Sequence, residues 1–253
     1  MDTIIVAAAH AKRVSGMLSE DTRLDLLPDG PIGRRHFKIK TAETAAHRRS
    51  ASVLLKDRYA WRGYRAVALP TDPTTNKITL SAIEHDLTIG TITVSLDGPD
   101  GLAADSTFAN EVGAMRAAGR RVCEFTKLAV DPISGTKRVL AALFHVAYVV
   151  AHRLRAYDVI VIEVNPRHVK YYERMLGFRV VGAERPNHGV QAPAVMLAAD
   201  FGYIKQQIDT FGGHPEKAAD ERSLYPHFFS LKEEAGIIHR MMSAQRPASA
   251  SIN

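Results

Sequence analysis

The sequence predicts an α/β fold in which helices flank a mixed sheet. Within residues 88–96, apolar side chains alternate with Thr and Ser, a pattern typical of a strand with one buried face. Residues 157–164, "YDVIVIEV", form a continuous apolar run, which is typical of a strand covered on both faces. Helical patterns separate the strands. Such alternation favours a sheet covered by helices.

The first half of the chain is expected to begin the sheet. Residues 1–33 are predicted to form an N-terminal lead-in, because the breaker cluster "LPDGPIG" closes them. Hydrophobic periodicity then predicts, in order, a strand at 36–40, a helix at 41–60 and a hairpin of strands at 78–85 and 88–96.

The second half continues with alternating helices and strands. A helix at 165–176 has Asn165 as N-cap, Pro166 at its first position and Gly177 just past its end. The helix at 137–152 is apolar on most of its surface, so we expect it to be buried. The other predicted elements are a helix or two at 106–119, strands at 121–132, 178–184 and 193–200, a C-terminal helical extension at 201–242 and a disordered tail at 243–253.

The composition indicates a globular protein of the cytoplasm. The chain has 253 residues, of which 46% are hydrophobic, enough for one sizeable core. The longest strongly apolar run, at 139–151, is shorter than the roughly 20 residues that span a bilayer, and the amino end lacks the basic segment of a secretory signal. The single cysteine, Cys123, cannot form an internal disulfide, which fits a reducing compartment.

Positive charge is concentrated near the amino end. The whole chain carries 33 basic and 27 acidic residues, a net charge of +6. The stretch from Arg34 to Arg65 holds ten basic and two acidic residues, a net +8. Such a block steers an oppositely charged partner, which can be an acidic protein or nucleic acid, although a solvated helix face is equally compatible. Few aromatic residues interleave the block, which argues against nucleic acid.

Two stretches resemble a known superfamily. "VIVIEVNPRHVKYYERMLGF" (159–178) resembles the strand–Asn–helix segment of the GNAT superfamily of N-acyltransferases. "CEFTKLAVDP" (123–132) resembles the central strand of that superfamily, in the form shared with acyl-homoserine-lactone synthases.

The closest resemblance is to the long-chain N-acyl amino acid synthases, the FeeM-like family. It spans roughly residues 37–199, with segments in matching order: "YAWRGY" (59–64), "GTITVSLD" (90–97), "GLAAD" (101–105) and "EVGAMRAAGRRVCEFTKLAVDP" (111–132). The resemblance implies a GNAT-like acyl-CoA N-acyltransferase fold over residues 34–200, with a mixed, mostly antiparallel sheet. It also implies direct transfer of a fatty acyl group from acyl carrier protein to the α-amino group of an amino acid.

The donor implied by the resemblance is acyl-phosphopantetheine on the carrier protein, with no permanently bound cofactor and no metal. Acyl carrier protein is small and acidic, and Arg48, Arg49 and Arg58 are the expected docking residues. The glycine-rich loop of the acetyl-CoA branch is missing, since "DPISGTKRVLAAL" contains only Gly135. Coenzyme A is therefore a less favoured donor, because those glycines let backbone N–H groups close on its pyrophosphate.

Two cations are expected beside a helix N-terminus. If Thr136 is the N-cap, Lys137 and Arg138 occupy the first helical turn, where positive charge opposes the helix dipole. An anionic ligand such as the pantetheine phosphate would compensate this repulsion. The alternative is that both side chains point into water.

Glu124 is the candidate general base. It lies in the middle of an otherwise apolar strand, where a carboxylate needs a partner or a purpose, and it matches the glutamate of the homoserine-lactone synthases. Lys127 is a candidate for binding the carboxylate of the amino acid, or it pairs with Glu111 or Glu124. The two side chains share a site only if the strand contains a bulge, which the superfamily has at this point. A bulge would also free N–H groups of Leu128, Ala129 and Val130 for the thioester oxygen.

Other candidates follow from positions in the resemblance. Glu111 and Arg116 are candidate amino-acid-binding residues, although charges on an exposed helix are the commoner explanation for them. Tyr172 stands where many relatives have a Tyr that protonates the departing thiolate, while Asn165 is assigned mainly to capping with a possible pantetheine contact. Cys123 is interpreted as a buried structural thiol rather than a nucleophile.

Alternative functions stay open at this point. An acetyl-CoA-dependent GNAT acetyltransferase is disfavoured by the missing glycine loop, and an acyl-homoserine-lactone synthase by the "YAWRGY" and "GLAAD" segments. A catalytically silent module of the same fold that binds acyl chains is a further alternative. Such a module would bind ligand tightly without turnover.

Overall fold

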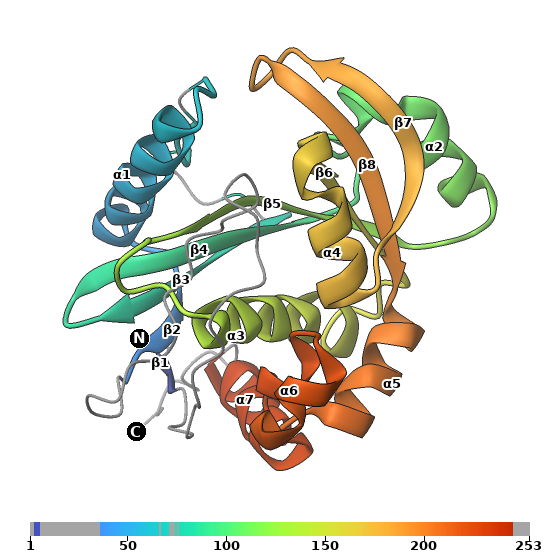
Figure 1. Ribbon diagram of the computed structural model, residues 1–253. Helices are drawn as coiled ribbons and strands as arrows, with labels where there is room; N and C mark the ends of the chain where they lie inside the picture. Colours follow the sequence, from blue (N-terminus) through green and yellow to red (C-terminus); the bar gives the residue numbers. More distant parts are fainter. Residues whose placement is uncertain (1–2, 6–35, 66, 71–73, 75, 245–253) are drawn as a thin grey trace, which may run out of the picture.

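One mixed sheet forms the centre of the protein (Figure 1). The computed structural model describes residues 3–5, 36–65, 67–70, 74 and 76–244. Within these residues eight strands pair in the order β1-β2-β3-β4-β5-β6-β8-β7, and every neighbouring pair is antiparallel except the parallel pair β5 and β6. The predicted mixed, mostly antiparallel sheet is thus confirmed. The strands are β1 Thr3–Ile5, β2 Lys38–Thr41, β3 Lys77–Glu84, β4 Leu87–Leu96, β5 Val122–Val130, β6 Val159–Val164, β7 Arg179–Asn187 and β8 Ala192–Asp200.

Helices cover both faces of the sheet. Helices α1 and α2 pack on one face, each over its own apolar cluster, while α3, α4 and the C-terminal elements share the large core on the other face (Figure 1). No helix within the described residues has the length and apolar character needed to cross a membrane. The helices are α1 Ala45–Trp61, α2 Asp105–Ala117, α3 Lys137–Tyr148, η2 Val149–Arg153, η3 Pro166–His168, α4 Val169–Leu176, α5 Phe201–Phe211, η4 Pro215–Lys217, α6 Ala218–Glu221, η5 Tyr225–His227 and α7 Leu231–Ala244.

Local sequence signals account for most helix ends. The side chains of Thr44 and Thr136 accept the N–H groups of His47 and Val139, each at 3.2 Å, and so cap α1 and α3. Asn165 caps η3 by accepting the N–H of Arg167, and Gly177 ends α4 in the left-handed conformation, with φ 73°. The caps at Thr136, Asn165 and Gly177 lie where the sequence predicts them.

The structure corrects the two ends of the predicted organisation. β1 pairs with β2, so residues 3–5 of the expected lead-in belong to the sheet, while residues 6–35 lie outside the described residues. At the other end α7 continues to Ala244, past the predicted start of the tail, and residues 245–253 lie outside the described residues. β7 also runs to Asn187, three residues beyond the predicted strand.

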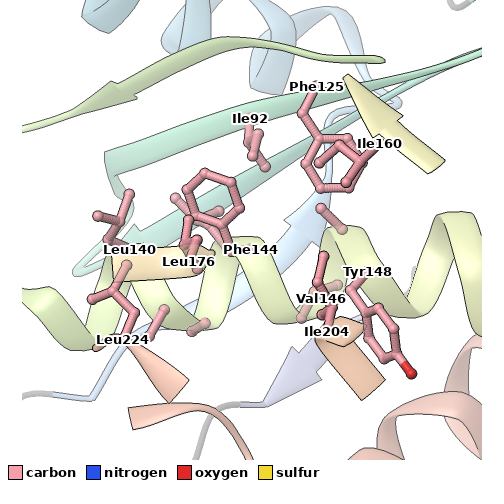
Figure 2. Close-up of a cluster of buried hydrophobic side chains, with 14 of the residues drawn as sticks. Ile92, Phe125, Leu140, Phe144, Val146, Tyr148, Ile160, Leu176, Ile204 and Leu224 are labelled. Atoms are coloured by element: carbon pink, nitrogen blue, oxygen red, sulfur yellow. The ribbon is translucent and has the colours of Figure 1, made fainter. Parts of the chain in front are cut away.

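The C-terminal extension completes the core beneath α3. Every residue of α3 from Val139 to Tyr148 is buried, which confirms the prediction for this apolar helix. Figure 2 shows its side chains between Ile92 and Phe125 of the sheet and Leu224 and Ile204 of the extension. The extension thus supplies the second apolar surface that a helix hydrophobic on all sides requires.

A buried polar network fastens the extension to α3. The N–H of Phe229 donates to Nδ1 of His145 at 2.9 Å, so the other ring nitrogen, Nε2, carries the proton and donates to Oε2 of Glu234 at 2.9 Å. The second carboxylate oxygen, Oε1 of Glu234, lies 3.0 Å from Nε of Arg153. One glutamate of α7 therefore satisfies two groups on α3 and η2.

Replacing Glu234 with Ala is expected to destabilise the fold by about 1–3 kcal/mol, because the buried N–H of His145 loses its acceptor. Denaturant unfolding of both proteins measures this difference. Lys232→Ala on the same helix is the matched control, since that side chain is exposed. A Glu234 variant as stable as the control would show that the network does not hold the extension.

Candidate active site

The sheet opens between its two parallel strands. β5 and β6 pair only over Val122–Glu124 and Val159–Val161, and β5 then continues alone to Val130. The resulting cleft has a volume of about 370 Å³, within the range of small-molecule sites. Its walls come from the end of α1, from β5 and β6, from η3 and α4, and from the β7–β8 hairpin. All lining residues lie between positions 59 and 194, so among the described residues the extension takes no part.

β5 contains the predicted bulge. Thr93 pairs with Thr126 and Thr91 with Ala129, so β5 has one residue more than β4 over this stretch. Lys127 has φ 51°, a conformation that marks the irregularity. As a result Glu124 and Lys127, three residues apart, both line the cleft. The expectation that a bulge brings them to one site is confirmed.

Glu124 is a buried carboxylate held by backbone. Its side chain is 1% exposed, and its Oε2 accepts the N–H of Ala103 at 2.8 Å. Burial, with a smaller contribution from Glu163, raises the pKa of Glu124 to about 7. No cation lies within ion-pair distance of it among the described residues, which removes the alternative of a satisfied ion pair. A group with this pKa is able to accept a proton at neutral pH.

Glu163 is a site residue that the sequence reasoning missed. It lies on β6 across the cleft from Glu124, and Nδ2 of Asn187 donates to its Oε2 at 2.6 Å. Burial raises the pKa of Glu163. The signal was present in the sequence, because Glu163 is the single polar residue in the run "VIVIEV".

The backbone N–H of Val130 faces the edge of β5 that is not paired with β4. The N–H of Asp131 donates to the carbonyl of Ile89 at 2.8 Å, which directs it toward the β4 side. Because successive N–H groups of a strand point to opposite edges, that of Val130 is directed to the side from which β6 has diverged. By the same alternation the N–H of Ala129 points to β4, so Val130 is the better oxyanion candidate of these two. Leu128 lines the cleft, whereas Ala129 and Val130 are not among its lining residues.

Tyrosines gather at another part of the cleft. Tyr172 of α4 lines it together with Tyr59, Tyr64 and Arg62 from the segment "YAWRGY", and with His168. Burial raises the pKa of Tyr172, so its hydroxyl keeps its proton at neutral pH. Apart from Tyr172, sequence reasoning gave these side chains no role. The only sequence signal for Tyr59, Arg62 and Tyr64 was the resemblance of the segment "YAWRGY" to the family.

Two predicted amino-acid-binding residues lie elsewhere. Nε of Arg116 bonds Asp97 at 2.7 Å and Nη1 bonds Asp105 at 2.6 Å. Glu111 is paired with Arg185 of β7, whose Nη1 donates to it at 3.0 Å. Neither Arg116 nor Glu111 lines the cleft. That role is therefore corrected, and these ion pairs instead fasten α2 to its neighbours.

Two of the three predicted docking residues are also corrected, because they are not on the surface. Arg48 is 6% exposed and donates to the carbonyls of Pro70 at 2.8 Å and Ala42 at 3.0 Å. Arg58 is 8% exposed, and its guanidinium lies 4.9 Å from the ring centre of Trp61. Arg49 is exposed as predicted. The sequence pattern did not reveal which face of α1 packs on the sheet.

The predicted phosphate-binding cations lie at the start of α3. Lys137 is half-buried, and burial together with the nearby Arg174 of α4 lowers its pKa. The guanidinium of Arg138 lies 5.8 Å from the ring centre of Phe37. Asn165 caps η3 and also lines the cleft. Arg174 adds a further cation near this helix N-terminus.

Cys123 is buried beside the candidate base, and burial raises its pKa well above the ordinary value. This environment fits the predicted structural thiol, because the thiolate is the nucleophilic form. Within the described residues no three His, Cys, Asp or Glu side chains form a group able to hold a metal ion.

The mixed sheet, with its split between two parallel strands beside a bulged central strand, has the GNAT-like fold that the sequence predicted. The family model for the N-acyl amino acid synthase FeeM matches residues 50–200, and the chain belongs to this family. The structure of FeeM, an N-acyl amino acid synthase from uncultured soil microbes, is 24% identical, with a TM-score of 0.61 over 68% of this chain and 95% of that chain. This likeness shows the shared fold.

Other solved structures are more distant. An acyl-CoA N-acyltransferase from Pseudomonas aeruginosa is 14% identical, with a TM-score of 0.46 over 64% of this chain and 97% of its own. The AHL synthase LasI is 12% identical, with a TM-score of 0.47 over 66% of this chain and 91% of its own. No curated protein sequence matches the chain.

Proposed function

We propose that the protein transfers a long-chain fatty acyl group from acyl carrier protein to the α-amino group of an amino acid. The observation that carries this proposal is Glu124, a buried carboxylate with a pKa of about 7 at the β5–β6 opening of a FeeM-family chain. An amine must lose its proton before it attacks a thioester. Glu124 is the group in the cleft whose pKa suits that step.

The proposed reaction proceeds without an acyl-enzyme. Glu124 takes one proton from the ammonium group, and the neutral amine nitrogen then bonds to the thioester carbon. The carbon–sulfur bond breaks, and the nitrogen loses its second proton to solvent. The N–H of Val130 donates to the carbonyl oxygen as negative charge develops on it. The thiolate takes a proton from Tyr172 or from solvent, since thiols leave readily with a pKa near 8.5. The buried, poorly ionised Cys123 supports direct attack.

The donor proposal depends on the start of α3. Lys137 and Arg138, with Arg174 nearby, would hold the single phosphodiester of phosphopantetheine. Only Gly135 is present in the preceding loop, and a Cβ added there would lie 2.3 Å from the carbonyl oxygen of Asp131. That glycine is required by close backbone packing, which leaves no glycine-rich cradle for the pyrophosphate of coenzyme A.

The donor assignment is tested by giving the purified protein a mixture of amino acids with palmitoyl carrier protein, palmitoyl-CoA or acetyl-CoA in separate reactions. We expect N-palmitoyl amino acid from the carrier protein, detected by mass spectrometry, with much slower formation from palmitoyl-CoA. Acetylated product alone would overturn the proposal in favour of an acetyltransferase. The absence of product from all three donors would favour a silent binding module.

The exposed face of α1 is the proposed carrier-protein docking surface. Arg49, Val53 and Lys56 are exposed at helical spacing, which joins two positive charges to one apolar side chain. This α1 face replaces the docking triad that the sequence predicted. It lies on the helix whose last turn reaches the cleft through Tyr59. An acidic partner with an apolar patch would fit such a surface.

Reversing Arg49 and Lys56 together to Glu is expected to raise the KM for acyl carrier protein about five- to tenfold at low salt, because attraction becomes repulsion. The difference should shrink at high salt, where exposed charges are screened. Steady-state kinetics with the donor varied measure it, and Lys232→Glu on the exposed side of α7 is the control. An unchanged KM at low salt would rule out the α1 face as the docking surface.

A further inference from the structure

Arg62 is a partly desolvated cation without a carboxylate partner among the described residues. It is half-buried and lines the cleft, and burial together with the nearby Arg58 lowers its pKa. The other titratable groups close to its guanidinium are the hydroxyls of Tyr172, Tyr64 and Tyr59. Among the described residues, no Asp or Glu lies within ion-pair distance of it, whereas Arg116, Arg153 and Arg185 each hold a carboxylate.

A second, independent observation at the same place is an unsatisfied nitrogen of His168. Its Nδ1 is buried and has no hydrogen-bond partner, although the residue lines the cleft. Its Nε2 accepts from Nε of Arg167 at 3.4 Å. Burial, with Arg62 and Arg167, lowers the pKa of His168 to about 4, so the ring is neutral at pH 7 and its proton is on Nδ1. An N–H in this position is a donor that lacks an acceptor.

The surroundings of Glu124, unlike those of Arg62, include a second carboxylate. Glu163 lies close enough to contribute to its raised pKa, Lys127 lies near Glu124, and Lys77 lies near Lys127. A further carboxylate brought to Lys127 would meet repulsion from both glutamates. A carboxylate brought to Arg62 meets a guanidinium and an N–H donor instead, and a guanidinium binds carboxylates with two parallel hydrogen bonds.

We infer that Arg62 and the Nδ1–H of His168 bind the α-carboxylate of the acceptor amino acid. The cleft then orients the zwitterion by charge: the ammonium faces Glu124, which takes its proton, and the carboxylate faces Arg62. This assignment rests on the proposed function and replaces the prediction that Lys127 anchors the carboxylate. Arg62 also lies near Tyr172, the residue proposed to protonate the leaving thiolate.

The test compares an accepted amino acid with its α-carboxamide, which has the same amine and side chain but no carboxylate. For the wild type, kcat/KM should favour the acid. In Arg62→Gln this preference should fall about 10- to 100-fold, which corresponds to the free energy of a hydrogen bond to a charged group. The fall should come from a lower kcat/KM with the acid, while kcat/KM with the amide should change little. Arg62→Lys should keep part of the preference. A merely structural effect would lower both rates together.

Two matched variants make the result specific. Arg65→Gln removes an exposed cation three residues away and should keep the wild-type preference. Lys127→Met should also keep it, and a collapse in that variant with an intact preference in Arg62→Gln would overturn the inference in favour of Lys127. A raised KM for the acyl donor alone in Arg62→Gln would overturn it in favour of a phosphodiester contact. Wild-type protein that acylates no amino acid would instead refute the proposed function.

Discussion

Replacing Glu124 with Gln is expected to lower kcat by about 10²- to 10⁴-fold, the usual contribution of a general base. The amide has the same shape, and its oxygen can still accept the N–H of Ala103, so the local structure should be kept. The amine would then have to lose its proton to water. The KM for the acyl donor should stay close to the wild-type value, because Glu124 does not touch the pantetheine in the proposed reaction.

Single-turnover kinetics with the carrier-protein donor measure this effect on the chemical step. Glu173→Gln is the control, since that side chain is exposed on α4. Thermal unfolding should give similar midpoints for wild type and both variants. A Glu124→Gln variant with the full wild-type rate would exclude this residue from the mechanism.

The second large effect is on pH dependence. Glu124 accepts a proton only in its ionised form, and burial raises its pKa to about 7. At saturating substrates, kcat should therefore fall about tenfold per pH unit below 7, close to 100-fold near pH 5. The rate falls toward acid pH because Glu124 acts as a base, and a base is inactive when it is protonated. In Glu124→Gln this acidic limb should disappear.

Glu163 supplies an internal check on that interpretation. Its negative charge is the second cause of the raised pKa of Glu124, after burial. Glu163→Gln should thus move the acidic limb of kcat to lower pH without removing it. A limb that stays in place in Glu163→Gln, or that persists in Glu124→Gln, would assign the titration to another group.

Sequence reasoning predicted the fold, and it singled out Glu124 as the candidate base, for identifiable reasons. Strand alternation, helix caps and the buried pattern at 137–152 are local signals that tertiary packing did not override. Glu124 was found because a carboxylate within an apolar strand conflicts with local rules. Such conflicts mark functional sites. Its neighbour Glu163 gave the same signal and was passed over.

The failures are of a different kind, because they depend on which way a side chain faces. Charge counting could not show that Arg48 and Arg58 pack inward beneath α1 while Arg49 points outward. Nor could spacing show that Arg116 is held between Asp97 and Asp105, or that Arg62 is left without a carboxylate in the cleft. These facts are set by contacts between residues distant in sequence.

The central claim is direct transfer of a fatty acyl group onto an amino acid in the β5–β6 cleft. A single-turnover reaction with excess enzyme, palmitoyl carrier protein and the accepted amino acid tests it, with product and intact enzyme followed in the same mass spectra. We predict N-palmitoyl amino acid forming in one phase, while the enzyme mass stays unchanged with or without the amine. An acylated enzyme that accumulates without amine and decays when amine is added would contradict direct transfer, and consumption of the donor without any acylated amino acid would contradict the synthase function itself.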